Sequence, residues 1–90
     1  RANRFRHLER LVKGFANHRR IQILELLKKK PELSVVDIVQ ALKINFKTAS
    51  EHIRRLAIAG LVLKRSSGPY VRHKLTSQAK SILKFLRTLE

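Results

Sequence analysis

The chain contains no cysteine, no methionine and no tryptophan, and only six of its 90 residues are acidic. Without cysteine, neither a disulfide bond nor a thiolate metal site can form. The few acids offer no paired carboxylates for acid–base catalysis, and the sequence shows no glycine-rich phosphate loop and no defensible Ser–His–acid arrangement. No apolar run approaches the roughly 18 residues of a membrane span. We therefore expect no enzymatic activity, no metal, no cofactor and no membrane partner.

What the chain has instead is positive charge: 21 Lys and Arg residues give a formal net charge of +15. Such an excess indicates a polyanionic partner. Because 43% of the residues are hydrophobic, we expect a folded domain and not a disordered basic tail. Ninety residues suffice for a single domain, 1–90. The chain starts at Arg1 and lacks methionine, so we expect it to be a piece of a longer product.

Apolar periodicity, capping residues and helix breakers predict five helices and one antiparallel hairpin. The helices are expected at residues 4–15, 17–30, 34–42, 45–59 and 77–89, and the strands at 61–65 and 70–75, between the last two helices. Ser34 and Asp37 form a variant capping box, and Gly60 is placed to end the fourth helix. This mainly α fold with a small β-hairpin is a winged helix-turn-helix, whose second helix fits the DNA major groove.

The helix at 45–59 has one polar, basic face. With Ile53 at the centre of the buried side, a rotation of about 100° per residue turns the polar residues outward or to the flanks. The predicted DNA-contacting residues of this helix are Lys47, Thr48, Ser50, Glu51, His52, Arg54 and Arg55. The first five are expected nearest the bases, and the two arginines on phosphates. Glu51 leaves two alternatives, because it could accept a hydrogen bond from cytosine or pair with a neighbouring arginine.

The hairpin carries a second group of basic and turn residues, which we expect at its tip. The predicted contacts of this wing are Lys64, Arg65, Ser67, Gly68, Tyr70 and Arg72. For Arg65 and Arg72 we favour DNA, either the backbone or a narrow minor groove. For Lys74 we favour a charge that protects an exposed strand edge. Tyr70 could contact a phosphate or pack against the wing.

Thr48 to Leu56, continuing through Gly60-Leu61-Val62, resembles the S-x-H-[LI]-x-x-L-x-x-x-G-L-[VL] signature of ArsR-type winged-helix repressors. Residues 16–24 and 32–38 are similar to two further stretches of that family, with Arg20 at the position of its arginine, so the resemblance spans about residues 8–86. It implies a dimeric DNA-binding regulator. Ser34 and Val36 stand where metal-sensing members have cysteines, and the last helix lacks the histidines of the other familiar metal site. His73 stands where an aromatic residue is usual, and we expect it to pack rather than to bind metal.

The first helix has apolar residues spaced alternately three and four apart, as in a narrow helix–helix seam. The resemblance implies that this helix and the last one form a dimer interface, although both could simply close the core of one domain. The predicted interface residues are Phe5, Leu8, Val12, Phe15, Ile82, Phe85, Leu86 and Leu89.

These observations predict a sequence-specific regulator of transcription, a repressor that binds a palindromic operator in double-stranded DNA as a homodimer in the prokaryotic cytoplasm. The alternatives are a winged-helix adaptor that binds protein, or a non-specific nucleic-acid-binding module of a larger assembly. An RNA-binding module is less favoured, since the A-form major groove excludes helices and the chain has few aromatics for base stacking. The small-molecule inducer, if there is one, stays open.

Overall fold

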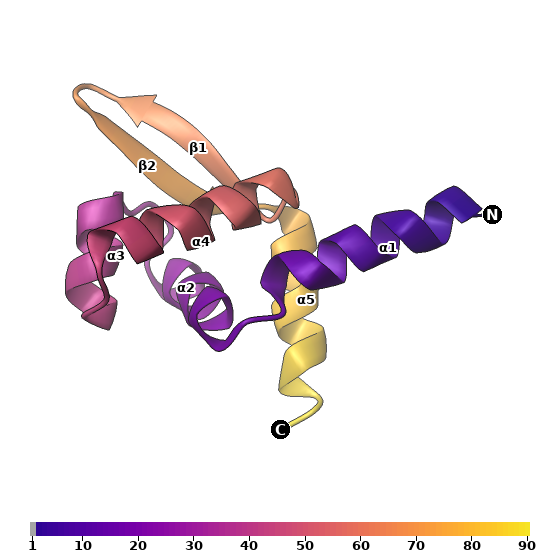
Figure 1. The fold of residues 1–90 in the computed structure, drawn as a ribbon. Coiled ribbons are helices and arrows are strands. Elements are labelled where there is room, and N and C mark those ends of the chain that lie inside the picture. The colour runs from indigo at the N-terminus through magenta and orange to yellow at the C-terminus, as the bar shows by residue number, and fades with distance from the viewer. Residues whose placement is uncertain (1) are drawn as a thin grey trace.

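The computed structural model describes residues 2–90; Arg1, where the predicted domain begins, lies outside the described residues. The elements follow the expected order (Figure 1). Their bounds are α1 Ala2–Phe15, α2 His18–Lys29, α3 Val35–Leu42, α4 Phe46–Ile58, β1 Val62–Ser67, β2 Tyr70–Leu75 and α5 Ser77–Arg87. The predicted winged helix-turn-helix is thus confirmed. No helix within residues 2–90 is both long and apolar enough to cross a membrane.

Side-chain caps set the starts of the helices. The Asn17 side chain accepts hydrogen bonds from the backbone N–H groups of Arg19 and Arg20 at the start of α2. The predicted capping box is present at α3, where Ser34 Oγ accepts from the Asp37 N–H and the Asp37 carboxylate accepts from the Ser34 N–H. Each such bond satisfies a backbone donor that the first turn would otherwise leave unpaired.

The turn between α3 and α4 is equally local in origin. Lys43 adopts the left-handed conformation, with φ +55°, and Asn45 then caps α4 by accepting from two backbone N–H groups. Gly60 follows α4 with φ +79°, as expected for a glycine that ends a helix. Together these residues fix where the second helix of the motif begins and ends.

The core lies where α2, α3, α4, α5 and the base of the hairpin meet. Its buried hydrophobic residues are Ile23, Leu24, Leu27, Ile38, Ala49, Ile53, Leu56, Leu61, Val62, Leu75, Ala79, Ile82 and Leu83. Helix α1 extends away from this body (Figure 1), and only its C-terminal half packs against the core, through Leu11 and Phe15. The buried residues of α4, which are Ala49, Ile53 and Leu56, face this core and so fix the rotation of α4 about its own axis.

Strands β1 and β2 pair antiparallel from Val62 opposite Leu75 to Ser67 opposite Tyr70, which leaves Gly68 and Pro69 as a two-residue turn. The sequence analysis predicted that the first strand ends at residue 65 and that a longer turn follows it. That boundary is wrong, because the ladder continues for two more residues and Gly68, with φ +60°, supplies the tight turn. The last helix likewise ends at Arg87, before the predicted residue 89.

His73 anchors the hairpin to the body. Its backbone pairs with Leu33 through two hydrogen bonds, 2.8 and 3.3 Å long, so that β2 has β1 on one edge and Leu33 on the other. The ring is buried, with 2% exposure, and its Nδ1 lies 2.9 Å from the Leu33 carbonyl oxygen. Burial lowers the pKa of His73 below its usual value. The expectation that this histidine packs is therefore confirmed.

Candidate nucleic-acid interface

Helix α4 presents to solvent the face that the sequence assigned to DNA. Ala49, Ile53 and Leu56 are buried beneath it, with at most 1% of each exposed. Five of the predicted contact residues are exposed: Lys47, Thr48, Glu51, Arg54 and Arg55. Ser50 and His52 are half-buried on the two flanks of the helix. Between exposed Phe46 and exposed Ile58 at the two ends of α4, the outward surface is consequently a row of hydrogen-bond donors with one acidic group near its middle.

That acidic group, Glu51, is paired with both neighbouring arginines. Arg54 donates from Nε and Nη2 to the two carboxylate oxygens, at 3.1 and 2.8 Å, and Arg55 Nε donates to Oε2 at 3.1 Å. The hydrogen bonds from Arg54 and then Arg55 lower the pKa of Glu51 to about 2, so it is ionised near neutral pH. Of the two alternatives for Glu51, arginine pairing is the one present in this structure.

His52 connects α4 to the helices behind it. Its Nδ1 accepts a hydrogen bond, 3.1 Å long, from Nε of Arg20, which requires a neutral ring with its proton on Nε2. Burial, and then the positive charge of Arg20, lower the pKa of His52. With Nδ1 occupied, only Nε2 of this ring remains available to an external ligand.

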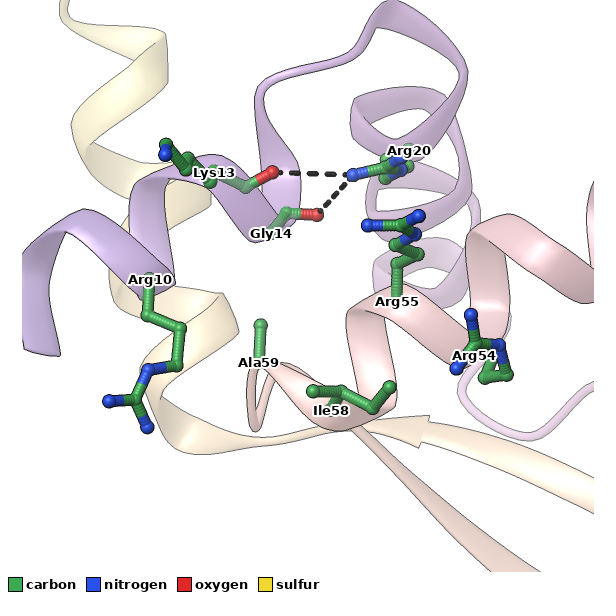
Figure 2. Close-up of a pocket in the computed structure, with 8 residues that line it drawn as sticks. All are labelled: Arg10, Lys13, Gly14, Arg20, Arg54, Arg55, Ile58 and Ala59. Carbon is green, nitrogen blue, oxygen red and sulfur yellow. Dashed lines mark hydrogen bonds between the residues drawn. The ribbon is translucent and has the colours of Figure 1, made fainter.

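Arg20 also donates to the carbonyl oxygens of Lys13, at 3.3 Å, and Gly14, at 3.2 Å (Figure 2). A single guanidinium thus joins the C-terminal end of α1, α2 and α4. Only the family resemblance singled out Arg20. Its role could not be read from spacing, because His52 is 32 residues away.

The basic residues of the wing lie farther from its tip than expected. Arg65 and Arg72 face each other across the ladder two pairs below the end of the ribbon, and Lys64 lies opposite His73, another pair lower. The prediction that these three cations cluster at the tip is therefore wrong, and the two-residue extension of β1 is the reason. The tip itself consists of Ser67, the Gly68–Pro69 turn and exposed Tyr70.

Glu32, to which the sequence analysis gave no role, contacts both wing arginines, Arg65 through its carboxylate and Arg72 through its backbone carbonyl. Glu32 forms an ion pair with Arg65, whose Nε donates to Oε1 at 3.1 Å, and the Glu32 carbonyl oxygen lies 3.5 Å from Nη1 of Arg72. The hydrogen bond from Arg65 lowers the pKa of Glu32. The sequence carried no signal for this contact, which spans 33 residues. Arg65 is thus held against the body, close to the start of α3.

The predicted dimer residues divide into two groups. Exposed apolar side chains project from α1, from α5 and from the turn that follows α5: Phe5, Leu8, Val12, Phe85 and Leu89, with exposures of 43–66%. Phe15 and Leu86 pack partly against the core, and Ile82 belongs to it, with 9% exposure. Assignment of Ile82 to the interface needs correction, because its side chain is largely used within the monomer. Whether the exposed group meets a second copy stays a prediction.

Residues 2–90 contain no cluster of three or more His, Asp or Glu side chains that could hold a metal ion. His7, His18 and His52 do not converge with acidic residues into such a cluster.

Comparison with known proteins places this architecture in a family. The model of the bacterial regulatory protein arsR family matches residues 17–64, just over half of the chain. HlyU from Vibrio cholerae is 31% identical, with a TM-score of 0.83, over 96% of this chain and 94% of that one. A winged helix-turn-helix DNA-binding domain from Mycobacterium bovis, a possible ArsR-family regulator, is 29% identical with a TM-score of 0.89, over 98% of this chain and 82% of that one.

The transcriptional repressor PagR of Bacillus anthracis shares the fold, with a TM-score of 0.85 and 23% identity over 96% of this chain and 99% of that one. No curated protein sequence matches the chain. The family match covers α2, α3, α4 and the start of β1, which include the capped turn and the helix with the basic face. The chain belongs to the ArsR family of bacterial regulatory proteins.

Proposed function

We propose that this chain is a transcriptional regulator that binds double-stranded DNA in a sequence-specific manner as a homodimer, and that it represses. The observation that carries the proposal is the outward face of α4, which is polar and basic from Lys47 to Arg55 while its opposite face is buried. A helix of this kind fits the major groove of B-form DNA. A protein-binding adaptor would favour a continuous apolar outward face, whereas the two exposed apolar residues of α4, Phe46 and Ile58, stand apart at its two ends.

Within this proposal the residues of α4 divide by position. Lys47 and Thr48 lie in the first turn, which enters the groove most deeply in helix-turn-helix proteins, and they read base edges together with Ser50. Arg54 and Arg55 lie farther along and hold phosphates. His52 contributes through Nε2. Glu51 orients the two arginines in the free protein, and it can exchange one of them for a cytosine amino group on DNA.

The wing supplies a second contact. Tyr70, Ser67 and the Gly68 backbone at its tip lie farthest from the body, and they reach the phosphates that flank the groove. Arg65 and Arg72 follow them along one face of the ribbon, joined by exposed Lys64 on the other. Contact of Arg65 with DNA competes with its ion pair to Glu32. Because Arg65 is exposed and Glu32 is partly exposed, water weakens that ion pair and its exchange for a phosphate costs little.

Dimerisation rests on the exposed apolar residues of α1 and α5. Five large hydrophobic side chains, on α1, on α5 and in the turn after α5, form more exposed apolar surface than isolated surface residues of a monomer need. The related Mycobacterium bovis domain is described as homodimeric, and PagR as a repressor. A two-fold dimer presents its two copies of α4, the recognition helix, about 34–36 Å apart, which matches the spacing of the two half-sites in a palindromic operator. Such a regulator works beside the bacterial chromosome, in the cytoplasm, and needs no catalytic group.

The test is a selection of bound duplexes from a random-sequence pool, followed by titrations with Lys47→Ala and Arg65→Ala. Lys47→Ala is expected to relax the preference at one base position, with a loss of about 1–3 kcal/mol there. Arg65→Ala is expected to weaken binding to all duplexes equally, whatever their sequence. Lys84→Ala, on the exposed side of α5, removes the same charge far from α4 and serves as the matched control. If the purified protein selects no sequence from the pool at low salt, the proposed function is wrong.

A further inference from the structure

A shallow cavity of about 330 Å³ lies where the C-terminal part of α1 meets the C-terminal part of α4, beside α2 (Figure 2). Five of the eight residues that line it are cationic: Arg10, Lys13, Arg20, Arg54 and Arg55. No acidic residue lines it. Two of these five, Arg54 and Arg55, also belong to the outward face of α4, so the cavity continues the surface proposed to face DNA.

The positive charge of this cluster is only partly compensated. Glu9 pairs with Lys13 at 2.9 Å, and Glu51 pairs with Arg54 and Arg55. Five cations and these two acids leave a net charge of +3. Within residues 2–90, neither Arg10 nor Arg20 has an ion-pair partner. Concentrated, exposed cations of this kind attract a polyanion.

Close packing fixes the position of α1 relative to α4. A Cβ atom added to Gly14 would lie only 2.3 Å from the Cβ of Ala59, so this contact leaves no room for a side chain at residue 14. Arg20 holds the same end of α1 through two of its last carbonyl groups. The side chains of Arg10 and Lys13 therefore project from a helix whose end is held beside the recognition helix.

These cations lie on a different face of α1 from the apolar residues predicted to form the dimer. At about 100° per residue, Arg10 is turned about 180° from the mean direction of Phe5, Leu8, Val12 and Phe15, and Lys13 about 120°. A partner protomer that covers the apolar stripe consequently leaves the cationic side of α1 accessible.

We infer that the cationic edge formed by Arg10 and Lys13 of α1, next to Arg54 and Arg55, is a further phosphate-binding surface that holds the DNA backbone beside the recognition helix. This inference rests on the proposed function and extends it to α1. The N-terminal half of a recognition helix goes deepest into the groove, so its C-terminal half lies nearer the sugar–phosphate backbone. An open depression rimmed by flexible cations suits the backbone of a duplex, to which such contacts give affinity and position but no sequence preference.

Arg20 acts here as a positioning residue. Its guanidinium is engaged by His52 and by the α1 carbonyl groups, so it adds positive potential and holds α1 in place while Arg10 and Lys13 reach the phosphates. Ala59 and exposed Ile58 supply the apolar part of the lining between these cations.

The experiment compares the salt dependence of binding for the wild type and Arg10→Ala/Lys13→Ala, using a duplex that the wild type selects. Each phosphate contact contributes about 0.9 to the slope of log K against log salt concentration. In a homodimer the double substitution removes up to four contacts, so the slope is expected to become shallower by about 2–4, with the base preferences unchanged. Lys84→Ala/Arg87→Ala removes the same charge from the far end of α5 and should change the slope much less. Sedimentation must show that both variants keep the wild-type oligomeric state.

If both double variants change the slope by the same small amount, Arg10 and Lys13 act only through net charge and the inference is wrong. A change in base preferences with Arg10→Ala/Lys13→Ala would equally overturn it, because phosphate contacts carry no sequence information. These outcomes differ from failure of the proposed function, in which the wild-type protein itself selects no duplex.

Discussion

Replacement of Gly14 by alanine tests the contact that joins α1 to the recognition helix. Glycine in a helix is ordinarily less favourable than alanine, so this substitution at a solvated position would stabilise by about 0.5–1 kcal/mol. Here the added Cβ would meet the Ala59 Cβ at 2.3 Å, well inside the 3.5–4.0 Å of an ordinary carbon–carbon contact. At least one of the two helices must move by more than 1 Å to relieve this overlap.

The overlap decides the sign of the effect. Overpacking of this kind costs about 1–3 kcal/mol, which exceeds the gain in helix propensity. We therefore expect Gly14→Ala to lower the free energy of unfolding by about 0.5–2 kcal/mol. The double variant Gly14→Ala/Ala59→Gly should recover much of that loss, since the new methyl group would then lie 3.8 Å from the Cα of residue 59. The two changes exchange one methyl group across the contact.

The assay is urea unfolding of the wild type, both single variants and the double variant, at one protein concentration because a dimer links stability to concentration. The expected signature is a favourable coupling energy of about 1–3 kcal/mol in the double-mutant cycle. If Gly14→Ala stabilised the protein and the two changes were additive, the helices would not touch at this point. The reasoning about a rigid cationic edge beside α4 would then lose its basis.

Three further predictions concern the fold that carries the site. Ser34→Ala removes the side-chain acceptor of the capping box that it forms with Asp37, and it should cost about 1 kcal/mol in urea unfolding. A Cβ atom added at Gly60 would meet its nearest neighbour, Oε1 of Gln78, only at 4.0 Å, so Gly60→Ala causes no clash. Its expected cost of about 1–2 kcal/mol in the free energy of unfolding comes from the left-handed backbone alone, and a neutral result would contradict that φ value. The pKa of His73 is lowered by burial, so the unfolded chain takes up its proton first as the pH falls below about 6.5. The free energy of unfolding should consequently decrease from pH 7.5 to 5, and His73→Phe, which leaves the backbone pairing with Leu33 in place, should make this decrease smaller.

Much of the interface was predictable because local rules govern it. The direction of α4 residues follows from a 3.6-residue period and one buried stripe, so Lys47, Thr48 and Arg54 could be assigned to the outward face from spacing alone. Caps such as Asn45 act within three residues, which makes them readable in a sequence. The strand boundary at Ser67 was misjudged because serine and glycine are typical of turns, and only the pairing partner decides how far a ladder continues.

The contacts that tune the interface could not be predicted in this way. Arg20 reaches His52 and Arg65 reaches Glu32 across more than 30 residues of sequence, and the helix and strand periods carry no information about such pairs. The same limit applied to Ile82, whose place on an apolar stripe did not tell whether its own core or a second copy would cover it.

The order of elements, the register of the recognition helix and the sign of its partner's charge are fixed within the primary sequence, because hydrophobic period, capping and net charge are local or additive properties. Which cations stand free and which are tied to an acid or a carbonyl depends on how distant segments are brought together. Only tertiary packing decided which cations are free. The close approach of Gly14 and Ala59 positions Arg10 and Lys13 beside α4, and the bridge between Leu33 and His73 positions the arginines of the wing.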